Sequence, residues 1–196
     1  MKRVIVSIWL CVAAVYAFSQ DNAKYLAGAV PEKEGKVYFS KEIKAGQLSK
    51  EEIYNVVSDW CNLKFAQADG FRRQVLPLDS VQKTMLVAAG DDYLVFQSRL
   101  LSLDRAHILY NFTANCTDGS CEVAIFRITY RYKTASSDEP ERYTAEEMIS
   151  DATAIKKGKL VKGAAKFRIK TIDYVDSIYA EIEGLLGREM LKKMNK

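Results

Sequence analysis

The single histidine of the sequence, His107, leaves a Ser-His-Asp system with one candidate base. It lies in a strand-like stretch beside Arg105, and no G-x-S-x-G elbow accompanies it. The H-E-x-x-H, C-x-x-C, Walker and G-x-G-x-x-G motifs of metal, redox and nucleotide sites are also missing from the sequence. We therefore expect a non-catalytic protein with no cofactor and no metal. The alternative is an enzyme with an unrecognised site on an open sheet face near Arg99, Arg105 and His107.

Two cysteines, Cys116 and Cys121, flank the turn signal Thr117–Ser120. A hairpin there places them opposite each other, with Cβ atoms about 4.5–5.5 Å apart, which is close to disulfide reach. In an oxidising compartment we expect them to form a disulfide. Cys61 lies on the apolar face of a predicted helix and is expected to be a buried free thiol.

A basic segment between Ala152 and Ile172 contains no acidic residue. It can form a surface for an envelope protein or an anionic glycan or lipid. The alternative is a strand or loop whose lysines simply face water. Its basic residues are Lys156, Lys157, Lys159, Lys162, Lys166, Arg168 and Lys170.

Residues 1–19 have the three parts of a secretory signal peptide. Lys2 and Arg3 form a basic start, an uncharged apolar run extends to Phe18, and Ala17 and Ser19 are small residues before a cleavage site. The run is shorter than the roughly 20 residues of a membrane anchor. A lipoprotein signal would use Cys11, but the bulky Leu10 precedes it.

Removal of this leader leaves no expected transmembrane span. The leader carries two of the net +4 charges of the 196-residue chain, so the remainder is nearly balanced at +2. This balance gives no reason to expect nucleic acid as a partner. We expect an exported protein, located in the periplasm or cell envelope or secreted.

Alternation of apolar and polar residues predicts a strand over 37–44. Ser49 and Glu52 then form a capping-box pattern that predicts the start of a helix, which fades near 67–70. Further strands are predicted over 84–89 and 93–99, on either side of a turn at Gly90-Asp91-Asp92.

The clearest hairpin joins predicted strands 105–116 and 121–133. A slip in the apolar alternation predicts a β-bulge near Ile125-Phe126. A second capping box, Thr144 with Glu147, predicts a helix that ends at Gly158. A last helix over 169–191 carries an apolar seam that fits core packing or, alternatively, a coiled-coil assembly: Ile172, Val175, Tyr179, Ile182 and Leu186.

Runs of consecutive strands flanked by helices predict an α+β fold, with an antiparallel sheet of about five strands backed by helices. The sequence moreover resembles a family of exported proteins of the Bacteroides group, which has no known function and a TBP-like fold. The resemblance rests on whole segments rather than on a short motif: VYFSKEIKAGQLSKEEIYNVVSDW, SLDRAHILYNFTANCTDGSCEVAIFRITYRY, ERYTAEEMISD and KFRIKTIDYVDSIY.

The resemblance implies a fold whose sheet is curved and an exported location, but no activity, and DNA binding does not carry over with a TBP-like fold. The expected organisation is a signal peptide (1–19), an extended lead-in (20–36), a TBP-like domain (37–133) and a helical C-terminal extension (134–196). We expect a binding or structural module of the cell envelope that contacts protein or an anionic glycan or lipid.

Overall fold

The computed structural model describes residues 23–66, 73–77, 81–99, 102–134 and 138–195. The expected leader, residues 1–19, lies outside them. The strands are β1 (Glu32–Lys33), β2 (Lys36–Lys44), β3 (Gln74–Pro77), β4 (Met85–Arg99), β5 (Ser102–Thr117), β6 (Ser120–Tyr132), β7 (Glu141–Thr144), β8 (Ile155–Lys156) and β9 (Lys159–Leu160). The helices are α2 (Lys50–Lys64), α3 (Ala145–Ile149), α4 (Asp151–Ala154) and α5 (Lys162–Met194).

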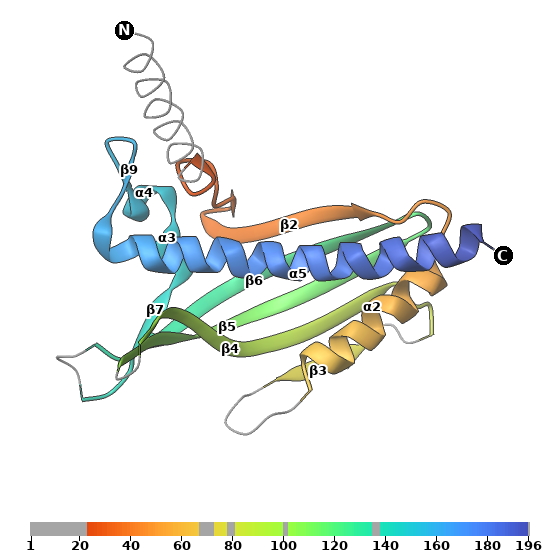
Figure 1. The fold of residues 1–196 in the computed structure, drawn as a ribbon, viewed down its shortest axis with the longest axis horizontal. Helices are drawn as coiled ribbons and strands as arrows, with labels where there is room; N and C mark the ends of the chain where they lie inside the picture. Colours follow the sequence, from red (N-terminus) through yellow and green to blue (C-terminus); the bar gives the residue numbers. More distant parts are fainter. Residues whose placement is uncertain (1–22, 67–72, 78–80, 100–101, 135–137, 196) are drawn as a thin grey trace, which may run out of the picture.

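One antiparallel sheet forms the centre of the molecule, with strand order β1-β2-β6-β5-β4-β3 (Figure 1). Strand β7 pairs with β6, which makes seven strands in this sheet of the described chain instead of the expected five or so. The added strands are short and therefore show too little alternation to be recognised in the sequence. The α+β prediction is confirmed.

The predicted hairpin is confirmed as β5 and β6, which pair directly from Thr117 and Ser120 onward. The register shifts by one residue between Leu109 and Asn111 of β5. On β6 the bulge contains Arg127, whose φ of 52° lies in the left-handed region. The bulge is thus confirmed, just beyond the predicted position.

The predicted turn at Gly90-Asp91-Asp92 is wrong, because β4 runs through it without interruption. Gly90 pairs with Tyr110 of β5, and the Tyr110 ring lies across the glycine. A Cβ atom on Gly90 would lie 2.2 Å from the ring carbon Cζ. Glycine is therefore required here to make room for an aromatic ring rather than to turn the chain.

Helix α2 begins as the capping box predicts. The Ser49 side chain accepts a hydrogen bond from the Glu52 backbone, and the Glu52 carboxylate accepts one from the Ser49 backbone. The buried face of the helix includes Ile53, Val57 and Trp60. These residues belong to the core that α2 shares with the sheet and α5.

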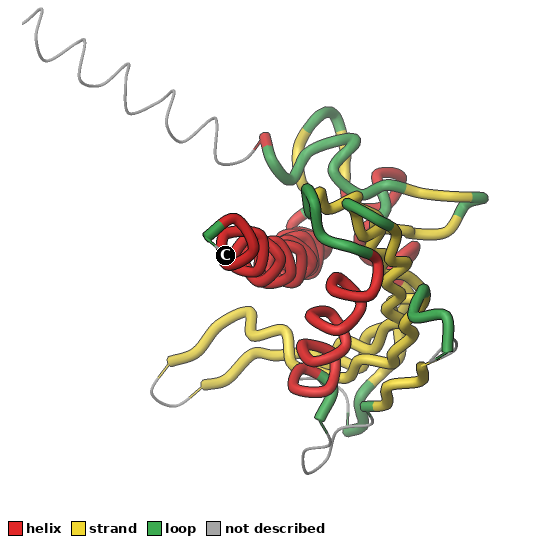
Figure 2. The backbone as a smooth tube through the Cα atoms, turned by 90° about the vertical axis from the view of Figure 1, so that its right-hand side faces the viewer, coloured by secondary structure: helices red, strands yellow, loops and turns green. Residues whose placement is uncertain are grey.

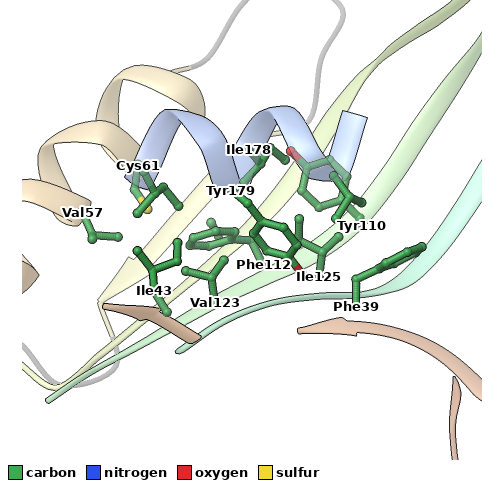
Figure 3. Close-up of a cluster of buried hydrophobic side chains, with 14 of the residues drawn as sticks. Phe39, Ile43, Val57, Cys61, Tyr110, Phe112, Val123, Ile125, Ile178 and Tyr179 are labelled. Atoms are coloured by element: carbon green, nitrogen blue, oxygen red, sulfur yellow. The ribbon is translucent and has the colours of Figure 1, made fainter. Parts of the chain in front are cut away.

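Helix α5 extends over 33 residues and lies along the sheet (Figure 1). The predicted seam residues Ile172, Val175, Tyr179, Ile182 and Leu186 are all buried, which confirms core packing as their role. Figure 3 shows side chains of both helices and the sheet meeting in this core, with Phe112 at its centre. The Phe112 ring is 5.4 Å from that of Trp60.

The predicted helix from Thr144 to Gly158 forms instead as two short helices, α3 and α4, and the helical structure ends at Ala154. Its capping box is present, but α3 ends at Ser150, whose ψ of 157° is extended. Ser150 then caps the short α4, and the chain continues into the β8–β9 hairpin. Residues 134–196 therefore contain three short strands as well as helices.

Helices α2 and α5 lie on the same side of the sheet (Figure 2). Buried and more accessible residues alternate along β5, so its remaining side chains point away from these helices. We call the surface that they share with the corresponding residues of β4 and β6 the outer face. It includes Arg105 and His107 of β5. No described helix is long and apolar enough to cross a membrane.

Candidate functional site

Four residues of the predicted basic segment cluster where β8–β9 leads into α5. Lys156 and Lys159 are direct partners in the hairpin, and Lys162 is the first residue of α5. The turn between the strands consists of Lys157 and Gly158, with φ values of 51° and 72°. Two consecutive positive φ angles are typical of the tight turns that join β-hairpins. We call Lys156, Lys157, Lys159 and Lys162 the basic hairpin.

The lysines of the basic hairpin are all exposed. None of them forms an ion pair within the described parts of the chain, whereas most of the other described lysines do, for example Lys24 and Lys193. Lys170 is also exposed, but it lies eight residues beyond Lys162, about 12 Å along α5. The structure therefore brings together four of the seven predicted residues.

Lys166 is engaged in contacts with the sheet. Its ammonium group donates to Asp104 Oδ2 at 2.9 Å and to the Tyr132 hydroxyl at 2.7 Å. It also lies 4.7 Å from the centre of the Phe96 ring. These contacts give Lys166 a role in attaching α5 to the sheet.

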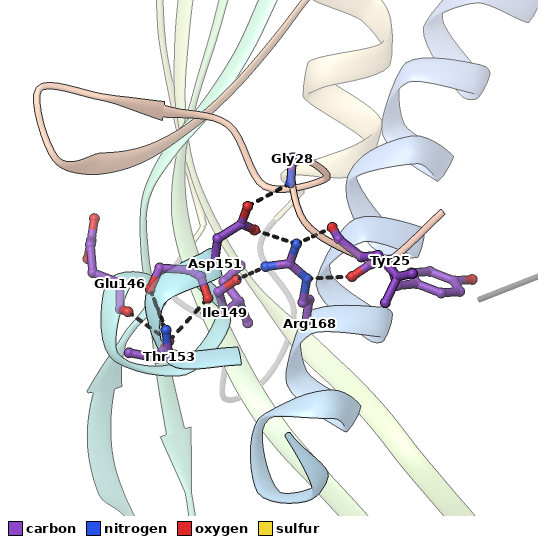
Figure 4. A network of polar contacts seen from close by, with 9 residues as sticks. Tyr25, Gly28, Glu146, Ile149, Asp151, Thr153 and Arg168 are labelled. Atoms are coloured by element: carbon purple, nitrogen blue, oxygen red, sulfur yellow. Dashed lines mark hydrogen bonds and ion pairs between the residues drawn. The ribbon is translucent and has the colours of Figure 1, made fainter. Parts of the chain in front are cut away.

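Arg168 does not belong to any surface, contrary to the prediction, because its side chain is completely buried. Its guanidinium donates to the carbonyls of Tyr25, Leu26 and Ile149 at 2.5–2.6 Å and to Asp151 Oδ1 at 2.6 Å (Figure 4). A buried charge is tolerated only when it is paired and hydrogen-bonded in this way. Arg168 therefore joins the N-terminal segment, α3, α4 and α5.

Cys116 and Cys121 are direct partners in the β5–β6 register, as expected. The Cys116 amide donates to Thr84 O at 2.7 Å, away from β6, so the cysteines form a non-hydrogen-bonded pair, the kind with the closer side chains. Their Sγ atoms are 3.7 Å apart, and the thiols are free, so the disulfide is not formed in the structure. Cys61 is a buried free thiol, as predicted, and burial raises its pKa to about 12.

His107 lies on the outer face with its ring 4.2 Å from that of Tyr93, centre to centre. Its Nδ1 is 3.1 Å from the buried carboxylate of Asp91. A carboxylate at one ring nitrogen fixes the orientation of an imidazole, as it does for many acid–base and anion-binding histidines. The side chain of Arg99, also considered for this surface, lies outside the described part.

A cleft with a volume of about 510 Å³ opens beside His107. Of its lining residues, sequence reasoning named only Arg105 and His107, and it missed the polar residues Tyr93, Arg131 and Lys133 among others. The signal was present in part, since Arg131 and Lys133 alternate with apolar residues on a predicted strand. Their proximity to His107 depends on the β-bulge, which makes Arg131 its direct partner. Among the described residues no group of His, Cys, Asp and Glu is arranged to hold a metal ion.

These features define a class of protein in which a central antiparallel sheet carries two long helices on one side and a basic cleft on the other. Residues 39–131 match a family described as a domain of unknown function (DUF4468) with TBP-like fold. A search of curated proteins gives no match.

Two crystal structures are similar to the chain. One is a DUF4468 family protein from Bacteroides ovatus, with 34% sequence identity and a TM-score of 0.77 over 85% of this chain and 95% of that one. The other is a TBP-like protein from Parabacteroides distasonis, with 20% identity and a TM-score of 0.68 over 81% and 97% of the two chains. The chain belongs to the DUF4468 family, and its fold is TBP-like.

Proposed function

We propose that the protein is an exported, non-catalytic binding module of the cell envelope that contacts an anionic glycan or lipid. The observation that carries this proposal is the basic hairpin, in which four exposed lysines gather without ion pairs in the described structure. Most of the other described lysines form ion pairs with acidic side chains, as Lys24 does with Asp173 and Lys193 does with Glu52.

Single exposed ion pairs contribute little free energy in water, about 0–1 kcal/mol each. A surface that presents repeated negative charges can engage several lysines at once, and the contributions then add. A glycan with acidic groups and a membrane with anionic headgroups share this chemistry. Binding through exposed charges also weakens as salt shortens the screening length from about 10 Å at 0.1 M to about 3 Å at 1 M.

We expect the mature protein to bind vesicles containing phosphatidylglycerol or an acidic polysaccharide such as polygalacturonate, but not neutral phosphatidylcholine vesicles. Changing Lys156, Lys157, Lys159 and Lys162 together to Gln should abolish cosedimentation, and salt should weaken it in the unmodified protein. Comparison of the two anionic probes identifies whether lipid or glycan is the source.

In a control variant, Arg188 and Lys192 are changed to Gln instead. Both lie on α5 more than 25 residues after Lys162, about 40 Å away along the helix. This variant should bind like the unmodified protein. Binding that is insensitive to both salt and the basic-hairpin substitutions would contradict the proposal. So would failure to bind either anionic probe.

Export makes a separate prediction about the covalent state. Protein isolated from the periplasm should begin at or near Gln20 and should contain one thiol, Cys61, that reacts after denaturation. Only a small movement is needed to bring the Cys116 and Cys121 sulfur atoms from 3.7 Å to the bond length of about 2.05 Å. Mass spectrometry and thiol titration provide the measurements. An intact Met1 would contradict cleavage, and three reactive thiols would contradict the disulfide.

A further inference from the structure

The cleft on the outer face lies where β4, β5 and β6 run side by side near β7. Its strands present Tyr93, Arg105, His107 and Arg131 as neighbours, because Tyr93 and Arg131 are the direct partners of His107 on either side. Lys133 lies two residues after Arg131 and lines the same cleft. Two arginines, one lysine and one histidine therefore surround one hollow, beside the Tyr93 ring.

Two of the cations in this hollow, Arg131 and Lys133, keep their charge free of acidic partners in the described structure. Asp104 is the acidic residue among those that line it in the described structure, and its carboxylate is bound to Lys166 at 2.9 Å. Arg131 and Lys133 form no ion pair with a described residue. Arg142 of β7, the direct partner of Arg131, adds a further positive charge next to it.

The side chains are also held in position. The Arg105 guanidinium lies 3.7 Å above the centre of the Tyr93 ring. Stacking on a ring holds the guanidinium in place and leaves the N–H groups at its edge for acceptors. The Asp91 carboxylate orients the His107 ring, because its Oδ1 lies 3.1 Å from His107 Nδ1. Arg105 and His107 are thus positioned before any ligand arrives, which reduces the entropy lost on binding.

We propose that this cleft binds the phosphate group of a small phosphate monoester, with a sugar phosphate as the best-fitting class. Arginine forks match the oxygen geometry of phosphate, and several cations around one hollow favour a dianion over a single carboxylate. A volume of about 510 Å³ exceeds what one phosphate fills and lies in the usual range of small-molecule sites. Leu103 and Pro140 supply apolar wall for the rest of the ligand. The inference is independent of the basic hairpin, because the two sites share no residue.

His107 provides a direct readout, because it is the only histidine of the sequence. In protein prepared without a polyhistidine tag, its imidazole proton signals are unambiguous in an NMR spectrum. We expect glucose 6-phosphate to shift these signals in a saturable manner, and glucose to leave them unchanged. An equal affinity for inorganic phosphate would overturn the sugar part of the proposal, and the absence of any shift would overturn it entirely.

Vesicles containing phosphatidic acid distinguish a lipid headgroup from a soluble ester, since both carry a phosphate monoester. A response to vesicles alone would assign the phosphate to a lipid and overturn the soluble sugar phosphate. The variant with all four lysines of the basic hairpin changed to Gln should bind glucose 6-phosphate normally. This result separates failure of the cleft from failure of the proposed envelope contact.

Substitutions identify the cations that bind. R105Q and R131Q should each weaken the affinity for glucose 6-phosphate by about tenfold or more, the usual effect of losing a charge-assisted hydrogen bond. R188Q removes the same charge from an exposed position on α5 and should leave the affinity unchanged. Equal affinities in R105Q, R131Q and R188Q would overturn the site. Thermal unfolding of each variant verifies that it is folded.

Discussion

Replacement of Arg168 by Met should lower the free energy of unfolding by about 3–5 kcal/mol, the usual cost of removing one member of a buried, hydrogen-bonded charge network. Methionine fills part of the volume but cannot donate to the carbonyls of Tyr25, Leu26 and Ile149 that Arg168 satisfies. The carbonyls of Tyr25 and Ile149 would lose the guanidinium donor and contribute to the cost, whereas Leu26 O would keep the hydrogen bond that it accepts from the Ala29 backbone at 3.1 Å. Urea unfolding measures the change.

Lys170 supplies the matched control for Arg168, because it lies only two residues further along α5 and is exposed. Lys170→Met should change the free energy of unfolding by no more than about 0.5 kcal/mol. The Arg168 variant should also be cleaved sooner by proteases near residues 23–30, since this segment is held by the guanidinium. Equal stabilities of the two variants would contradict the structural role of Arg168.

Replacement of Gly90 by Val should destabilise the protein by at least about 3 kcal/mol, at the upper end of the cost of overpacking. A Cβ atom alone would lie 2.2 Å from Tyr110 Cζ, and valine adds two methyl groups. The ring has little room to move, because its hydroxyl lies 3.0 Å from that of Tyr174. Thermal or urea unfolding provides the comparison.

A double-mutant cycle tests whether the ring is the cause. In a Tyr110→Ala background the same Gly90→Val change should cost much less, with a coupling energy of about 2 kcal/mol or more. Ala89→Val, the neighbouring position on the outer face, should be nearly neutral, because valine suits a half-exposed strand. The same cost for Gly90→Val in both backgrounds would show that the ring is not responsible.

The features predicted correctly from the sequence are encoded by neighbouring residues. Both capping boxes need only residues three apart, and the β5–β6 hairpin needs only its turn and the alternation beside it. The wrong predictions concern residues whose structural role is determined by a residue far away in the sequence. Gly90 has the composition of a turn, but Tyr110, 20 residues away, determines its role. The burial of Arg168 depends on carbonyls more than 140 residues away, which no local pattern reveals.

The candidate site shows the same division. The pairing of the cysteines follows from the hairpin, whereas extending the hairpin register without interruption would place Tyr130 opposite His107. The bulge at Arg127 moves the register by one residue and brings Arg131 there. A single-residue shift exchanges the two faces of a strand, so the cleft could not be assembled from sequence alternation alone.

The position of α5 in the chain affects how the protein can fold. All strands of the central sheet precede this helix, yet its residues cover much of the inner apolar face, and Glu181 alone binds both Trp60 and Lys64 of α2. In a nascent chain whose α5 has not yet been synthesised, the apolar face of the sheet therefore remains exposed to solvent. Such a chain reaches its native state only when α5 packs onto the sheet, which is a late, long-range step. Until then chaperones can bind the exposed apolar face.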